Sequence, residues 1–267
     1  MTDREAEASA RAALDAAVAE LYAAFRGRRL SRNGPAACTF CCASPEAMAR
    51  IVAASDAGTP HAIGASDLAE YHSGVMGVPE EVAEDLSFLL PRILEIVAAE
   101  GGAASDDLHL LFAFGCQAIW PQLSERERDT VCGYLRALTR LCVGMPEEER
   151  SVRLNIADIL ELAATAGFDV DPVIDALCDL PRTRATTDFL IDLILDRAWL
   201  WQGSERGYGV PKDAVEHIGA RLRAVLSTPD TLARFEAVAL ADTNRDPRAA
   251  IRAERASLAH HLMECCD

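Results

Sequence analysis

The chain has 267 residues, of which 50% are hydrophobic, 25% are charged and only 6% are aromatic. This apolar content excludes a disordered chain, and the length is sufficient for a substantial core. The formal net charge of −16 argues against nucleic acid as a partner, because binding it depends on lysines and arginines that neutralise phosphates.

The cysteine count and the charge pattern bear on the cellular compartment. Nine cysteines are an odd number, and they are scattered along a long chain, which does not fit a disulfide framework. The first residues are too charged for a secretion signal, and no apolar run approaches the ~20 residues that span a bilayer. We therefore expect a cytoplasmic protein with no membrane partner.

Apolar residues recur at helical spacing along nearly the whole chain, and no stretch alternates convincingly as a strand does. In the first segment, for example, Leu14, Val18, Leu21 and Phe25 fall on one helical face. The predicted fold class is all-α, with about twelve helices. We place them near 3–28, 45–56, 66–76, 79–99, 105–120, 124–143, 147–166, 172–180, 184–201, 211–226, 229–241 and 247–265.

Several helix starts carry capping signals. Four of them place a capping side chain before a proline at the first helical position: Ser44-Pro45, Asp171-Pro172, Thr228-Pro229 and Asp246-Pro247. Ser124 followed by Glu127 predicts a capping box. Pro91 interrupts the range 79–99, but the apolar face continues through it, so we expect a single kinked helix there.

The helices are expected to form a single domain over 1–267, with a subdivision into a module at 1–100 and an array at 105–267 as the alternative. In the second part they fall into pairs that start near 105, 147, 184 and 229, which is the spacing of HEAT-like repeats. No sequence motif recurs between the pairs. Two architectures therefore stay open, a HEAT-like α-solenoid and a compact irregular helical bundle.

The most informative local feature is a C-x-x-C motif, formed by Cys38 and Cys41 in a short loop before the helix start at Ser44. Two thiolates at this spacing can bind one zinc ion if two further ligands are supplied from elsewhere. The candidates for these further ligands are Cys42, His61 and His72 nearby, and His260, His261, Cys265 and Cys266 at the C-terminus. His261 and Cys265 are four residues apart, so they share a helical face and can chelate together.

Two other interpretations of the motif stay open. The thiols can be redox-active, since nearby arginines would lower their pKa values; these are Arg26, Arg28, Arg29 and Arg32. Alternatively, the cysteines are small apolar residues that fill a junction between two helices.

The C-x-x-C loop, the arginines before it and the segment Leu89-Leu90-Pro91-Arg92-Ile93-Leu94-Glu95-Ile96 together resemble a family of uncharacterised bacterial helical proteins. The resemblance covers residues 1–100. Members usually have proline between the two cysteines, whereas Thr39 and Phe40 stand there in this chain, and Cys42 follows as a third cysteine. The resemblance implies that loop and helix form one module, and it implies no activity.

Sequence signatures of enzymes are missing. There is no G-x-x-x-x-G-K-[ST] phosphate loop, no G-x-S-x-G nucleophile elbow and no H-E-x-x-H zinc motif. We therefore expect a protein that is not an enzyme.

Acidic residues are concentrated in one part of the chain. The range 46–107 contains 12 Asp and Glu but only two Arg, a net charge of −10. Glu80, Glu81, Glu84 and Asp85 cluster on the opening turns of one helix, where the helix dipole favours acids. This face is either a solvated surface or a docking surface for a basic protein or peptide.

Two functions follow as hypotheses. The first is a non-enzymatic acidic helical scaffold for protein interaction, and an immunity-type protein that binds a basic toxic enzyme is its concrete version. The second is a zinc-binding or thiol-based regulator that uses Cys38 and Cys41.

Overall fold

The structure is a computed structural model of the chain. It describes residues 3–40, 42–75, 79–100, 119–144, 156–180, 182–196, 201–202, 211–240 and 247–265. These residues form eleven α-helices and two short 3-10 helices, and they contain no strand beyond one isolated bridge between Ala37 and Val75. The all-α prediction is confirmed. None of the helices described is long and apolar enough to cross a membrane.

The helix bounds agree closely with the predicted ranges. The first part contains α1 (Asp3–Ala24), α2 (Pro45–Ala57), η1 (Pro60–Ala62), α3 (Ala65–Gly74) and α4 (Pro79–Glu100). The second part contains η4 (Trp120–Gln122), α6 (Glu125–Gly144), α8 (Ile156–Thr165), α9 (Asp171–Cys178), α10 (Arg184–Asp196), α12 (Lys212–Leu226), α13 (Pro229–Ala239) and α14 (Pro247–Glu264). The predicted helix at 105–120 lies almost wholly outside the described residues.

Most of the predicted helix starts are confirmed by their hydrogen bonds. Ser44 accepts a bond from the backbone N–H of Ala47 at the start of α2, and Thr228 caps α13 in the same way. The capping box at the start of α6 has both of its reciprocal bonds. The prediction for Asp171 is wrong, because it lies inside the first turn of α9 and makes no cap. Asp246 falls outside the described residues.

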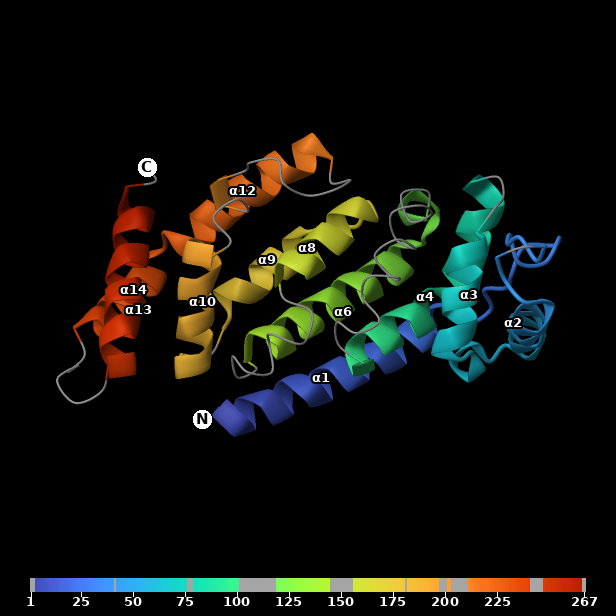
Figure 1. Cartoon of the computed structure of the whole chain (residues 1–267), viewed down its shortest axis with the longest axis horizontal. Helices are drawn as coiled ribbons and strands as arrows, with labels where there is room; N and C mark the ends of the chain where they lie inside the picture. The colour runs from blue at the N-terminus through green and yellow to red at the C-terminus, as the bar shows by residue number, and fades with distance from the viewer. Residues whose placement is uncertain are drawn as a thin grey trace.

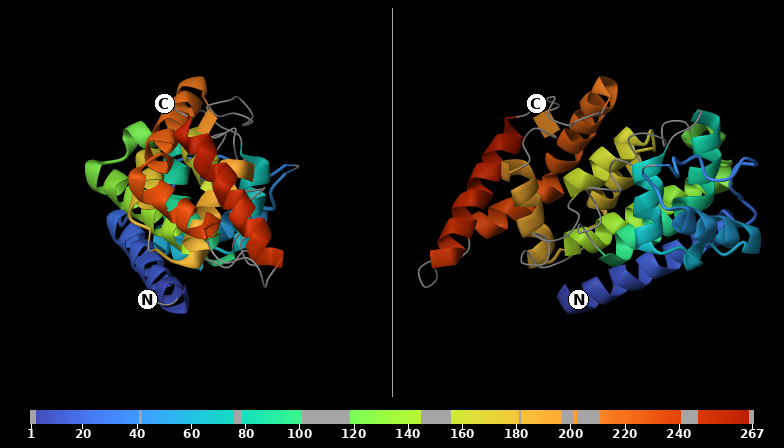
Figure 2. Two further views of the ribbon diagram at one scale, coloured as in Figure 1. Left: turned by 90° about the vertical axis from the view of Figure 1, so that its left-hand side faces the viewer. Right: turned by 45° about the vertical axis from the view of Figure 1, so that its right-hand side comes forward.

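The helices form an elongated array rather than a closed bundle. Figures 1 and 2 place α2 and α3 at one end of it and α13 and α14 at the other. Between these ends α1 packs along α6, α6 packs on α9, and α9 packs on α12. The predicted pair that starts near 229 is confirmed by α13 and α14, which pack together. The pair expected to start near 184 would join α10 to α12, but in the described part α10 packs mainly on α14 and α6.

One core runs through the described helices and crosses the suggested boundary near residue 100. The contact between α1 and α6 joins segments about a hundred residues apart in the sequence. The buried Tyr134 of α6 donates a hydrogen bond to the carbonyl of Leu94 in α4, at 2.7 Å. The module at 1–100 therefore shares its core with α6.

Arginine–aspartate pairs join neighbouring helices in the second part. Arg221 of α12 binds Asp171 and Asp175 of α9, at 3.2 and 2.6 Å, and Arg255 of α14 binds two aspartates of α10, at 2.9 and 2.8 Å. Each such pair is partly exposed and contributes little stability alone, typically below ~1 kcal/mol. The fork of an arginine side chain nevertheless favours one register between two helices.

Candidate functional site

Asp85 anchors the segment between α1 and α2, although the sequence predicted it on an exposed acidic face, either solvated or available for docking. Its side chain is 0% exposed, so that placement is wrong. The two carboxylate oxygens accept hydrogen bonds from the backbone N–H groups of Ser31 and Ala36, at 2.9 and 2.6 Å, and from the hydroxyl of Tyr71, at 3.2 Å. The physical reason is position: residue 85 is three residues after Val82 on the helix face that is buried.

Burial raises the pKa of Asp85, and the bonds from Ala36, Ser31 and Tyr71 oppose that rise only in part. A buried carboxyl with three donors is satisfied, and its donors come from two other segments of the chain. Asp85 therefore fixes the path of the chain between α1 and α2 relative to α3 and α4.

The other three acidic residues of the predicted cluster are closer to solvent. Glu80 and Glu84 are exposed, and Glu81 is partly exposed and accepts a 2.7 Å hydrogen bond from the side chain of Asn33. We call Glu80, Glu81 and Glu84 the acidic edge of α4. Because Asn33 belongs to the segment that Asp85 holds, the acidic edge borders that segment.

The cysteine loop, described at residues 37–40, 42 and 43, has one backbone hydrogen bond to the end of α3 and one within the loop. The N–H of Cys38 donates to the carbonyl of Gly74 at 2.6 Å, and the N–H of Ala43 donates to the carbonyl of Cys38 at 3.0 Å. A Cβ atom at Gly74 would lie 3.0 Å from the Cβ of Ala43 and 3.2 Å from the oxygen of Cys38. Just beyond the loop, the N–H of Ser44 donates to the carboxylate of Glu70 at 2.7 Å.

The loop presents an aromatic side chain to solvent. Phe40 is 96% exposed, the highest value among the large hydrophobic side chains described. Cys38 is half-buried and Cys42 is exposed. Cys41 lies outside the described residues. The ring of Phe40 therefore does not hold the loop in place by burial. The backbone hydrogen bonds of Cys38 and Ala43 hold it instead.

The nearby histidines do not assemble into a metal site with the described thiols. His72 lies on α3 and is partly buried, while His61 lies on η1, is exposed and packs edge-on against the ring of Tyr22. Among the described residues, which leave out Cys41, no group of three or more His, Cys, Asp or Glu could hold a metal ion. Zinc binding by Cys38 and Cys41 stays a prediction.

The C-terminal pair cannot complete that site. His261 and Cys265 do share a face as predicted, with 4.0 Å between the Nε2 and Sγ atoms. However, α14 lies at the opposite end of the array from α3, on which the cysteine loop is fixed (Figures 1 and 2). The prediction of a shared ion is therefore corrected. His260 pairs with Glu264 instead, and Cys266 is outside the described residues.

Arg28 is bound to a carboxylate and does not serve the thiols as the redox interpretation expected. Its Nε and Nη2 atoms donate to the two oxygens of Glu127, each at 2.7 Å. Burial raises the pKa of Glu127, but the bonds from Arg28 and Ser124 outweigh it, so the pKa is lowered overall. The sequence predicts only the capping-box role for Glu127. Its carboxylate fulfils both roles.

In comparisons with known proteins, no protein-family model matches this sequence, and no curated protein or solved structure matches it significantly.

Proposed function

We propose that the protein is a non-enzymatic scaffold that binds a basic protein through the cysteine loop and the acidic edge of α4. The observation that carries the proposal is Phe40, which is 96% exposed on a loop fixed by hydrogen bonds on both sides. An aromatic side chain on an ordered loop loses little entropy on binding and can contribute 2 kcal/mol or more, as roughly a hot spot does.

The charge of the surface indicates the kind of partner. Glu80, Glu81 and Glu84 border the segment that carries Phe40, and the whole chain has a net charge of −16. Such a field attracts basic proteins and raises their rate of association. The partner is therefore a basic protein with an apolar pocket for one aromatic ring. A basic toxic enzyme neutralised by an immunity-type protein is the concrete case, and a toxin gene beside this gene would support it.

The test compares partner capture by the wild-type chain and by Phe40→Ala. Loss of a hot-spot side chain is expected to weaken binding about 30-fold or more. Ile251→Ala is the matched control, because Ile251 is also exposed (60%) but lies on α14, at the other end of the array.

A second variant separates the charge from the ring. Reversing Glu80 and Glu84 to lysine is expected to slow association and to weaken its dependence on salt, with little change in dissociation. A partner that binds Phe40→Ala as tightly as the wild type would refute the proposal.

A further inference from the structure

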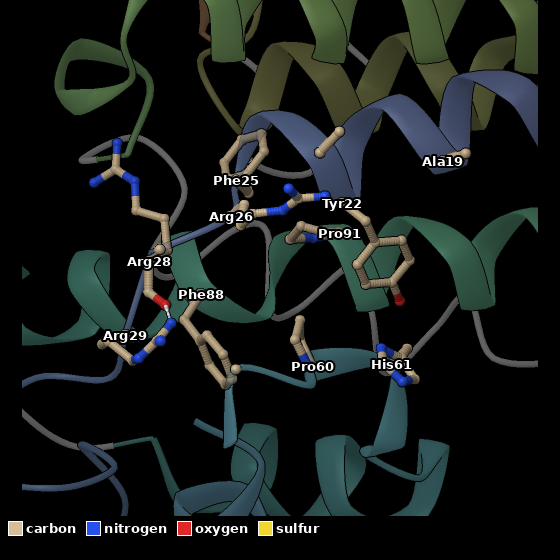
Figure 3. A pocket seen from close by; sticks show the side chains of 13 residues that line it. Ala19, Tyr22, Phe25, Arg26, Arg28, Arg29, Pro60, His61, Phe88 and Pro91 are labelled. Carbon is tan, nitrogen blue, oxygen red and sulfur yellow. Dashed lines mark hydrogen bonds between the residues drawn. The ribbon is translucent and has the colours of Figure 1, made fainter. Parts of the chain in front are cut away.

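A pocket of about 230 Å³ lies where the end of α1 meets η1 and the middle of α4 (Figure 3). Apolar and polar groups line it in similar measure. Phe25 and Phe88 contribute buried aromatic rings, and Pro60 and Pro91 contribute flat, rigid surfaces. Pro91 is the residue that interrupts α4, so its ring replaces a backbone N–H on the face of the helix that lines this pocket.

The polar groups around the pocket are cationic or neutral. Arg26, Arg28, Arg29 and His61 all line it, and none of its described lining residues is acidic. This is unusual in a chain with a net charge of −16. The pocket is therefore a positively charged site on a protein that otherwise repels anions.

The arginines differ in how far they are already engaged. The guanidinium of Arg28 forms an ion pair with Glu127 and is neutralised there. Arg29 donates to the carbonyl of Arg28 at 2.8 Å and lies against Gly58. Arg26 is exposed, and no ion pair or hydrogen bond joins it to any described residue. Arg26 therefore has its full set of donors available to a ligand.

The neighbouring carboxylate of Glu95 is bound by other groups. Glu95 accepts hydrogen bonds from the hydroxyl of Tyr22, at 2.5 Å, and from Arg92, at 2.6 Å. Arg92 in turn donates to the carbonyl of Ile63, at 2.8 Å, just beyond η1. This network holds Tyr22 and η1 in place as one side of the pocket. It also keeps the charge of Glu95 compensated.

We propose that this pocket binds a small organic anion. Its carboxylate or phosphate group pairs with Arg26, and its flat apolar body lies against Phe88, Pro60 and Pro91. An apolar cavity of about 150 Å³ holds a benzene molecule, so 230 Å³ has room for one ring and an anionic group. The planar fork of arginine matches either group with two parallel hydrogen bonds.

Calorimetric titration of the full chain with four probes tests this proposal. Benzoate and phenyl phosphate carry a ring and an anion, benzyl alcohol carries the ring alone, and inorganic phosphate carries the charge alone. We expect one site per chain for at least one of the ringed anions, and which of the two binds more tightly identifies the anionic group. Benzyl alcohol and inorganic phosphate are each expected to bind at least tenfold more weakly.

Variants at exposed positions keep the test independent of folding. Arg26→Met is expected to weaken binding of the ringed anion at least tenfold, and Arg26→Lys less so, because lysine keeps the charge but loses the fork. Arg32→Met is the matched control, since Arg32 is exposed and lies outside the pocket lining, and binding should be unchanged. Failure of both ringed anions to bind, equal binding by Arg26→Met, or equal binding of inorganic phosphate would each overturn the proposal.

Discussion

Replacing Asp85 by alanine removes the acceptor of two backbone N–H groups, those of Ser31 and Ala36, and of the Tyr71 hydroxyl. Both Asp85 and Tyr71 are fully buried, so water does not replace the lost acceptor without rearrangement. Each buried donor left without a partner costs about 1–3 kcal/mol. Because the tyrosine hydroxyl can reorient, we expect a total loss of about 3–5 kcal/mol from the free energy of unfolding, a large share of the ~5–15 kcal/mol of a typical domain.

Two further variants of α4 calibrate this number. Asp85→Asn keeps one acceptor oxygen but turns an amide donor toward another donor, so an intermediate loss of about 1–3 kcal/mol is expected. Glu84→Ala changes the preceding residue, which is exposed, and its effect should lie within about 0.5 kcal/mol of the wild type.

Urea denaturation followed by circular dichroism measures the three variants. Amide hydrogen exchange provides a second, local readout. The N–H groups of Ser31 and Ala36 should lose more protection in Asp85→Ala than the amides of α6, whose protection falls only as far as the global free energy of unfolding does. If the free energy of unfolding of Asp85→Ala lies within ~1 kcal/mol of the wild-type value and these two amides stay protected, the Asp85 carboxylate does not hold the segment between α1 and α2.

Three further predictions follow from single contacts. Gly74→Ala places a methyl group 3.0 Å from the Cβ of Ala43 and should lower the free energy of unfolding by about 1–3 kcal/mol. At Gly133 a Cβ atom has nothing within 4 Å, so Gly133→Ala should raise the free energy of unfolding by about 0.5–1 kcal/mol, and equal effects of the two variants would contradict the tight contact at Gly74. Because the pKa of Glu127 is lowered in the folded protein, its ionised carboxylate stabilises the fold at a pH above the ordinary glutamate pKa of 4.5, and this stabilisation is lost as the pH falls through the lowered pKa. The difference in free energy of unfolding between wild type and Glu127→Gln should therefore shrink in acid, and a difference that stays constant from neutral to acid pH would disprove this. If the C-x-x-C motif binds zinc, elemental analysis should find about one zinc per chain that is lost in Cys38→Ser, and stable metal-free protein would rule out the zinc site.

The helices were predictable because their signals are local. Periodicity over a few turns and a capping residue at each start both act within one element, so α2 and α13 begin where Ser44 and Thr228 indicated. The continuous helix through Pro91 was predictable for the same reason, since Leu86, Leu89 and Ile93 keep one apolar face on both sides of the proline. Their packing order was not predictable, because it joins α1 to α6 across the whole of α2, α3 and α4.

The site was only partly predictable, because its contacts are distant in the sequence. The C-x-x-C motif marks the cysteine loop in the sequence, but the carboxylate that fixes the chain before this loop lies 49 residues after Ala36. Charge alone suggested that Asp85 is exposed, whereas its position beside Val82 and Leu86 on the apolar face indicates burial. Arg28 and Glu127 are separated by 99 residues, and no local pattern links them.

The segment between α1 and α2 contributes to both the proposed docking surface and the proposed anion pocket, and variants of single residues can separate the two. Arg26 contributes to the pocket, and a few residues later Ser31 and Ala36 are held by Asp85 next to the acidic edge. Loss of Asp85 should therefore impair partner capture and binding of the ringed anion together. Phe40→Ala should affect only the partner, and Arg26→Met only the anion, because the two side chains are engaged in neither a common contact nor a common pocket. Loss of anion binding in Phe40→Ala would show instead that the pocket and the cysteine loop form one site.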